Sequence, residues 1–62
     1  MITDEYFSDD GLLKAQIMLM GYTYKVLMFN NERMVEIREF KGKTLDYVKD
    51  YCENYVQRVM QL

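Results

Sequence analysis

Histidine, tryptophan and proline are absent from this sequence, which contains one cysteine and three glycines. Without histidine, the chain lacks the usual general base at neutral pH and the commonest metal ligand. One cysteine cannot form an internal disulfide, a Cys-x-x-Cys redox pair or a cysteine-rich zinc site. The three glycines are isolated from one another, which excludes a glycine-rich phosphate-binding loop. We therefore expect no metal and no bound cofactor.

Two residues could in principle act as nucleophiles, and neither has a suitable neighbour. Ser8 is the only serine and lies among acidic residues, and no histidine is present to activate it or Cys52. A free cysteine in an apolar helical pattern is typically a small buried residue. The sequence therefore predicts no catalytic residue, and we expect that the protein is not an enzyme.

The 62 residues predict one domain, residues 1–62. A chain of this size hides only about 60% of its unfolded surface when it folds. Natural domains this small usually depend on a disulfide, a metal or a partner chain for stability. Because the first two are excluded here, we expect the protein to associate with itself, as a homodimer.

The start of the chain is acidic, with Asp4 and Glu5 close to Met1. A secretory signal would begin with basic residues followed by an apolar stretch. The longest strongly apolar run, Ile17–Met20, is too short to span a membrane. The lone cysteine fits a reducing compartment. These features predict a cytoplasmic protein without a membrane segment.

Residues 1–8 read as an acidic, flexible tail, and residues 9–20 read as a short helix. Ser8 or Asp9 can cap the first turn, because a side-chain oxygen accepts one of its free N–H groups. The apolar side chains recur at helical spacing, and Gly21 stands where a left-handed residue ends a helix. A strand over 15–20 is the alternative, since short apolar runs are ambiguous.

Residues 22–29 and 33–40 are rich in aromatic and branched side chains, which predicts a β-hairpin. Asn30-Asn31 is the expected two-residue turn, since asparagine tolerates positive φ. The matching register sets Lys25 opposite Glu36, an attractive cross-strand pair.

Residues 44–61 form the clearest pattern in the chain. Thr44 is a good helix cap, and Asp46 suits the positive end of the helix dipole. The apolar stripe recurs at intervals of three and four: Leu45, Val48, Cys52, Tyr55, Val59 and Leu62. The predicted fold is a small α+β domain in α-β-β-α order, in which a long C-terminal amphipathic helix covers an antiparallel hairpin.

Tyrosines at positions 47, 51 and 55 line one edge of this helix, and apolar side chains of the hairpin lack an obvious cover. Tyrosine and methionine are enriched in the cores of protein interfaces. The predicted interface residues are Tyr47, Tyr51, Tyr55, Val59, Leu27, Phe29 and Met34. The expected partner is a second copy or a larger host or cellular protein, and this composition is typical of small accessory or regulatory proteins of phage and bacteria.

Nucleic-acid binding through the hairpin is the alternative function. Its candidate residues are basic and lie on or just after the hairpin: Lys25, Arg33, Arg38, Lys41 and Lys43. Aromatic residues interleave with them, and such rings can stack on bases. Glutamates lie among these lysines and arginines, however, and the chain has a net charge of −2. Nucleic-acid binders usually have a clear positive field. Protein contact is therefore the preferred interpretation.

Overall fold

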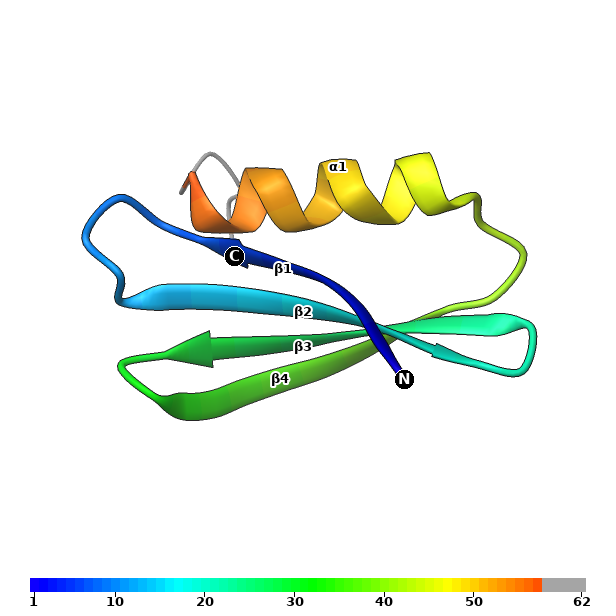
Figure 1. The fold of residues 1–62 in the computed structure, drawn as a ribbon, viewed down its shortest axis with the longest axis horizontal. Coiled ribbons are helices and arrows are strands. Elements are labelled where there is room, and N and C mark those ends of the chain that lie inside the picture. Colours follow the sequence, from blue (N-terminus) through cyan, green and yellow to red (C-terminus); the bar gives the residue numbers. More distant parts are fainter. Residues whose placement is uncertain (58–62) are drawn as a thin grey trace.

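The structure, a computed structural model, describes residues 1–57. Four strands are followed by one helix: β1 (Ile2–Phe7), β2 (Leu13–Met20), β3 (Thr23–Asn30), β4 (Arg33–Phe40) and α1 (Leu45–Val56). All neighbouring strands are antiparallel, and their order in the sheet is β1-β2-β3-β4. The fold is α+β, with α1 lying along one face of the sheet (Figure 1). The predicted α-β-β-α order, with a hairpin under a long helix, is wrong.

The predicted helix over residues 9–20 is replaced by β2. Leu13, Ala15 and Ile17 are buried on the side of α1, whereas Lys14 and Gln16 alternate with them on the other side. This period of two is the pattern of a strand with one face in the core. Its backbone pairs with β1 on one side and β3 on the other. The helical spacing in this segment is therefore coincidental.

Ser8 and Asp10 cap a turn instead of a helix. The backbone N–H of Leu13 donates to Ser8 Oγ at 2.9 Å, and that of Leu12 donates to Asp10 Oδ1 at 3.0 Å. Gly11 has φ +76°, a conformation that glycine adopts without steric penalty. Residues that favour helix starts also favour turns, because both offer a side-chain oxygen to free N–H groups.

The prediction of a flexible tail over residues 1–8 is also wrong, because Ile2–Phe7 form the edge strand β1. Tyr6 packs against the core. On the other face, Gln16 Nε2 donates to Glu5 Oε2 at 2.7 Å. An edge strand can carry acidic side chains because its backbone, rather than its side chains, supplies the pairing with β2.

The predicted hairpin is confirmed as β3 and β4, but its turn and register differ. The turn is Asn31-Glu32, with φ +53° and +68°, between the paired residues Asn30 and Arg33. Positive φ at both central residues defines a type I′ turn. A register shift between Met28 and Phe29 then changes the pairing further along the strands.

The shifted register changes which face each β4 side chain occupies. Lys25 faces Glu39 rather than Glu36, so an attractive pair is kept with a different partner. Ile37 pairs with Leu27 and lies away from α1, because a shift by an odd number of residues moves side chains to the other face. The register predicted from the charges is therefore wrong.

The helix predicted over residues 44–61 is shorter than expected: α1 spans Leu45–Val56 and Gln57 is its C-cap, and residues 58–61 of the predicted span lie outside the described residues. The backbone N–H of Tyr47 donates to Thr44 Oγ1 at 3.2 Å, which is the predicted cap. The buried side chains of α1 follow the predicted stripe: Val48, Cys52, Tyr55 and Val56.

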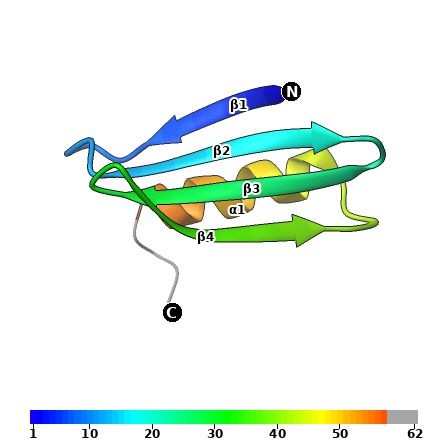
Figure 2. The same ribbon diagram turned by 90° about the horizontal axis from the view of Figure 1, so that it is seen from below.

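The core lies between α1 and the two central strands. Ala15, Ile17, Val26, Val48 and Cys52 have no exposed surface. The helix packs chiefly on β2, with smaller contributions from β1 and β3. Figure 2 shows the opposite face of the sheet, with α1 behind it.

The turn at residue 32 gives a test of the backbone assignment. A non-glycine residue with left-handed φ loses about 1–2 kcal/mol relative to the right-handed region, and glycine avoids this loss. Allowing for the greater freedom of glycine in the unfolded chain, we expect Glu32→Gly to raise the free energy of unfolding by about 0.5–1 kcal/mol. Urea denaturation measures the change. Glu32→Ala is the control; an equal gain from alanine would contradict the role of φ.

Candidate functional site

The face of the sheet turned away from α1 is not covered by any other element of the described residues, and we call it the open face. Strand pairing assigns its members, since paired residues in adjacent strands point to the same side. No element of residues 1–57 packs on it (Figure 2). Eight of its side chains are apolar: Ile2, Phe7, Met18, Met20, Leu27, Phe29, Met34 and Ile37.

Two rows of paired side chains cross the open face between its middle and the β3–β4 turn. The first runs Phe7, Lys14, Phe29, Met34, and the second runs Glu5, Gln16, Leu27, Ile37. Phe7 is 59% exposed and Ile37 is 54% exposed. Such large apolar side chains gathered on one surface are typical of a contact surface rather than of scattered surface residues.

A shallow hollow of about 160 Å³ lies at the turn end of the open face. Phe7, Lys14 and Phe29 contribute to its lining, together with Leu12 and Glu32. The ammonium of Lys14 lies 4.5 Å from the centre of the Phe29 ring, a cation–π contact that holds the lysine stem across the face. The hollow can therefore receive an apolar side chain beside a fixed positive charge.

The open face carries equal numbers of acidic and basic side chains. Strand pairing places Glu5, Lys14, Lys25 and Glu39 on it. Lys25 Nζ lies 4.0 Å from Glu39 Oε2. At the paired strand positions the two lysines and two glutamates cancel, so these positions create no field that would attract a strongly charged ligand.

The structure divides the predicted interface residues between the two sides of the sheet. Leu27, Phe29 and Met34 lie on the open face. The tyrosines at positions 47, 51 and 55 lie on the helix side, and Val59 lies outside the described residues.

The three tyrosines of α1 differ in exposure and role. Tyr55 is buried, and its hydroxyl donates to the backbone oxygen of Phe29 at 3.1 Å. Tyr51 packs edge-on against Phe40, with ring centres 5.0 Å apart. Tyr47 is 50% exposed and touches the other side of Phe40. The tyrosine edge therefore closes the core around Phe40, and Tyr47 alone of the three is largely open to contact.

The basic residues of the nucleic-acid alternative do not share one surface. Lys25 lies on the open face, whereas Arg38 lies on the helix side, where its guanidinium is 2.6 Å from Glu36 Oε2. Lys41 Nζ is 3.7 Å from Glu39, and Lys43 Nζ lies over the Tyr47 ring at 4.9 Å. Arg33 follows the β3–β4 turn. Glutamates thus neutralise three of the five, and no continuous basic stripe results from these positions.

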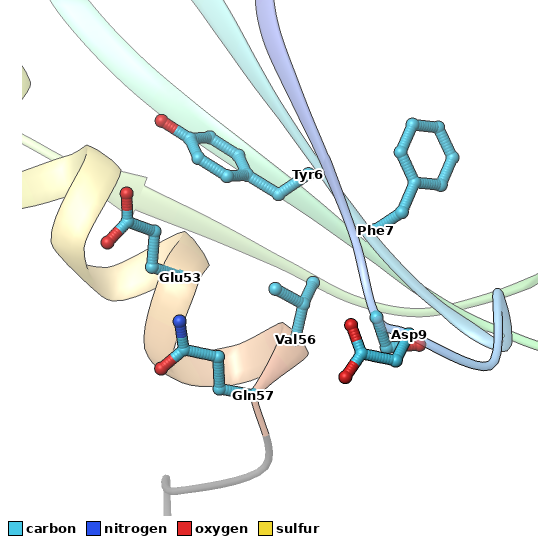
Figure 3. A pocket seen from close by; sticks show the side chains of 7 residues that line it. Tyr6, Phe7, Asp9, Glu53, Val56 and Gln57 are labelled. Atoms are coloured by element: carbon cyan, nitrogen blue, oxygen red, sulfur yellow. The ribbon is translucent and has the colours of Figure 1, made fainter.

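A second cleft, of about 550 Å³, lies between the end of β1 and the last turn of α1 (Figure 3). Tyr6 points toward α1, and Phe7 points to the other side of β1. Asp9 and Glu53 make the cleft acidic, and burial together with the Asp4 carboxylate raises the pKa of the Tyr6 hydroxyl. Two carboxylates on a surface cleft are too few to define a cation site.

Within residues 1–57, no three histidine, cysteine, aspartate or glutamate side chains lie close enough to hold a metal ion. Over the same residues, the one helix has neither the length nor the apolar character needed to cross a membrane.

Cys52 has no exposed surface and lies in the core, as its position in the helical stripe predicts. Burial raises the pKa of its thiol from 9.0 to about 12, and the carboxylates of Asp4 and Glu53 add to the effect. The thiol therefore stays protonated at neutral pH and is a weak nucleophile.

The sequence reasoning missed Phe7, Met18 and Ile37 as members of the exposed apolar surface. Phe7 lies in the predicted tail and Met18 in the predicted helix. The predicted register, with Lys25 opposite Glu36, puts Ile37 opposite Tyr24 and so on the other face from Leu27. A signal was present in Leu13-Lys14-Ala15-Gln16-Ile17, where apolar and polar residues alternate. That period of two predicts a strand, and a third strand would have shown that the sheet has two faces to cover.

Comparison with known proteins finds no relative: no protein-family model, no curated protein and no solved structure matches the chain. Function is therefore inferred from the residues and their geometry.

The raised pKa of Cys52 predicts a loss of stability at alkaline pH. Between pH 9 and about 12 the unfolded thiol releases its proton while the folded thiol keeps it. The contribution is therefore complete below pH 9 and is lost as the pH rises, since deprotonation favours the unfolded chain. Urea denaturation at pH 8, 9 and 10 measures the fall.

Cys52→Ala is the informative variant, because it removes the thiol and leaves the tyrosines. Burial also raises the pKa of Tyr6 and Tyr51, but from 10.0, so the fall that begins near pH 9 belongs to the thiol. We expect the alanine variant to lose less stability between pH 9 and pH 10 than the parent. An equal loss in both proteins would show that Cys52 does not titrate as described.

Proposed function

We propose that this protein is a non-enzymatic protein-interaction module of the accessory or regulatory type, and that the open face is its contact surface. One observation carries the proposal. Eight apolar side chains gather on the face of the sheet that no element of residues 1–57 covers. Exposed apolar surface of this kind is unfavourable in water and is typical of interaction sites.

The chemistry of the face supports contact with a protein. Phe29 and Leu27 are partly buried at its middle, while Phe7, Met34 and Ile37 extend from it. Aromatic residues and methionine are enriched at interface cores, where flexible methionine side chains adapt to the shape of the partner's surface. Its charged side chains are few: Lys25 pairs with Glu39, Lys14 lies over the Phe29 ring, and Glu5 accepts a hydrogen bond from Gln16.

The same distribution of charge favours protein contact over nucleic-acid binding. Of the basic residues in the alternative, only Lys25 lies on the open face, where it pairs with Glu39. Nucleic-acid affinity depends mainly on neutralising phosphates with clustered lysine and arginine. The cytoplasmic location and the absence of catalysis remain predictions of the proposal. A buried, protonated Cys52 and the absence of histidine support the prediction that the protein is not an enzyme.

Site-specific crosslinking in expressing cells tests the proposal. A photoreactive phenylalanine derivative is placed at Ile37 on the open face, and at Asp50 on exposed helix surface as the matched control. Because we place the contact on the open face, we expect irradiation to yield a discrete protein adduct from position 37, several-fold stronger than from position 50. The adduct is measured by mobility and mass.

The control defines the failure. Equal, diffuse labelling from both positions would contradict an interaction site on the open face. A discrete adduct from position 50 alone would assign protein contact to the helix side instead.

A further inference from the structure

We infer that the open face packs against the open face of a second copy, to form a two-layer sandwich of eight strands with the two helices outside. This inference rests on the proposed function and adds the identity of the partner. It differs from pairing at the sheet edges or between helices, because the surface involved is the one opposite α1 (Figure 2).

The charge pattern of the face fits a copy of itself. In a two-fold interface the same patch contributes from both sides, so a patch of one sign would repel itself. Here Lys14 and Lys25 balance Glu5 and Glu39, and the sum is zero. Each lysine on one copy can therefore face a glutamate on the other, and no excess charge is buried between them.

The size of the face also fits. Three strands of eight residues are each about 26 Å long and β1, with six residues, is about 20 Å long, so at a spacing of about 4.8 Å the sheet has a flat area of about 470 Å². Two copies would bury about 940 Å² before the relief of the side chains is counted, which approaches the lower limit of about 1,000 Å² for a specific interface. Stacked sheets pack about 10 Å apart through interdigitated side chains, and the hollow beside Phe7 and Phe29 can receive such a side chain.

The outer strands are poorly suited to pairing edge to edge. The register of β1 shifts between Ile2 and Asp4, and that of the β3–β4 pair shifts between Met28 and Phe29. Irregularities of this kind in edge strands disfavour the addition of a further strand. Packing on the face is therefore favoured over extension of the sheet.

Exchange of charges on the face tests the inference. Lys25→Glu changes the face charge from zero to −2, and Glu39→Lys changes it to +2. In each variant two like-charged faces would meet, so we expect the dissociation constant for self-association to rise at least about tenfold. An equimolar mixture of the two variants brings opposite faces together, and we expect association close to that of the parent. Sedimentation velocity at micromolar concentration measures each state.

The double variant Lys25→Glu/Glu39→Lys is the control, since it restores a neutral face and the cross-strand pair; we expect it to associate like the parent. Circular dichroism checks that each variant is folded. Three results would overturn the inference: a monomeric parent, single variants that associate like the parent, or a mixture no better than its components. If position 37 gives a discrete adduct with a different protein and the parent is a monomer, the inference of a second copy as partner is wrong. The proposal of an interaction module would still stand.

Discussion

A single helix can cover only one face of a four-stranded sheet, and the rest of this structure depends on that constraint. The twelve residues of α1 extend about 18 Å along a sheet in which β2, β3 and β4 run about 26 Å. Ala15, Ile17 and Val26 meet the helix and lose all exposure to water. Their neighbours along the same strands point the other way, because successive side chains alternate across a sheet. The set that points away from α1 therefore has no cover within residues 1–57.

Because the core is small, the contact proposed for this second face would add to stability as well. Tyr55 joins the two sides directly: its hydroxyl bonds the backbone oxygen of Phe29, whose ring lies on the open face. The strand that carries the centre of the open face is thus held from behind by α1. A surface held in this way keeps its shape before a partner arrives, which lowers the entropy lost on binding. A chain without a disulfide among its described residues gains from any burial that such a partner adds.

The sequence predicted correctly those elements in which the spacing of apolar residues fits either a helix or a strand, but not both. The interval of three and four from Leu45 onward, with Thr44 before it, fits only a helix, and the alternating aromatic segment around Tyr24 fits only a strand. The segment Leu13–Met20 satisfies both periods, since Leu13 and Ile17 lie four apart while Leu13 and Ala15 lie two apart. Its pairing with β1 and β3, which are remote in sequence, decides between them. The predicted turn is wrong by one residue for a similar reason. Asn30-Asn31 has the better local composition for a turn, but the pairing of β3 with β4 puts the turn at Asn31-Glu32.

The sequence likewise predicted only part of the candidate site. Leu27, Phe29 and Met34 could be identified because the hairpin alone leaves them without a cover. Phe7 and Met18 could not, because their exposure follows from two strands that the helical interpretation removed. The tyrosine stripe was given a contact role because a ring half buried in the core and a ring half buried in an interface have the same sequence pattern. The contacts of Phe40 decide between core and interface. Tyr47 and Tyr51 pack edge-on against its ring, so much of the apolar surface at this edge of α1 is covered within the chain. Among the strands of residues 1–57, most of the large apolar side chains that stay exposed lie on the other side of the sheet, and this imbalance between the two faces is the physical reason to place contact there.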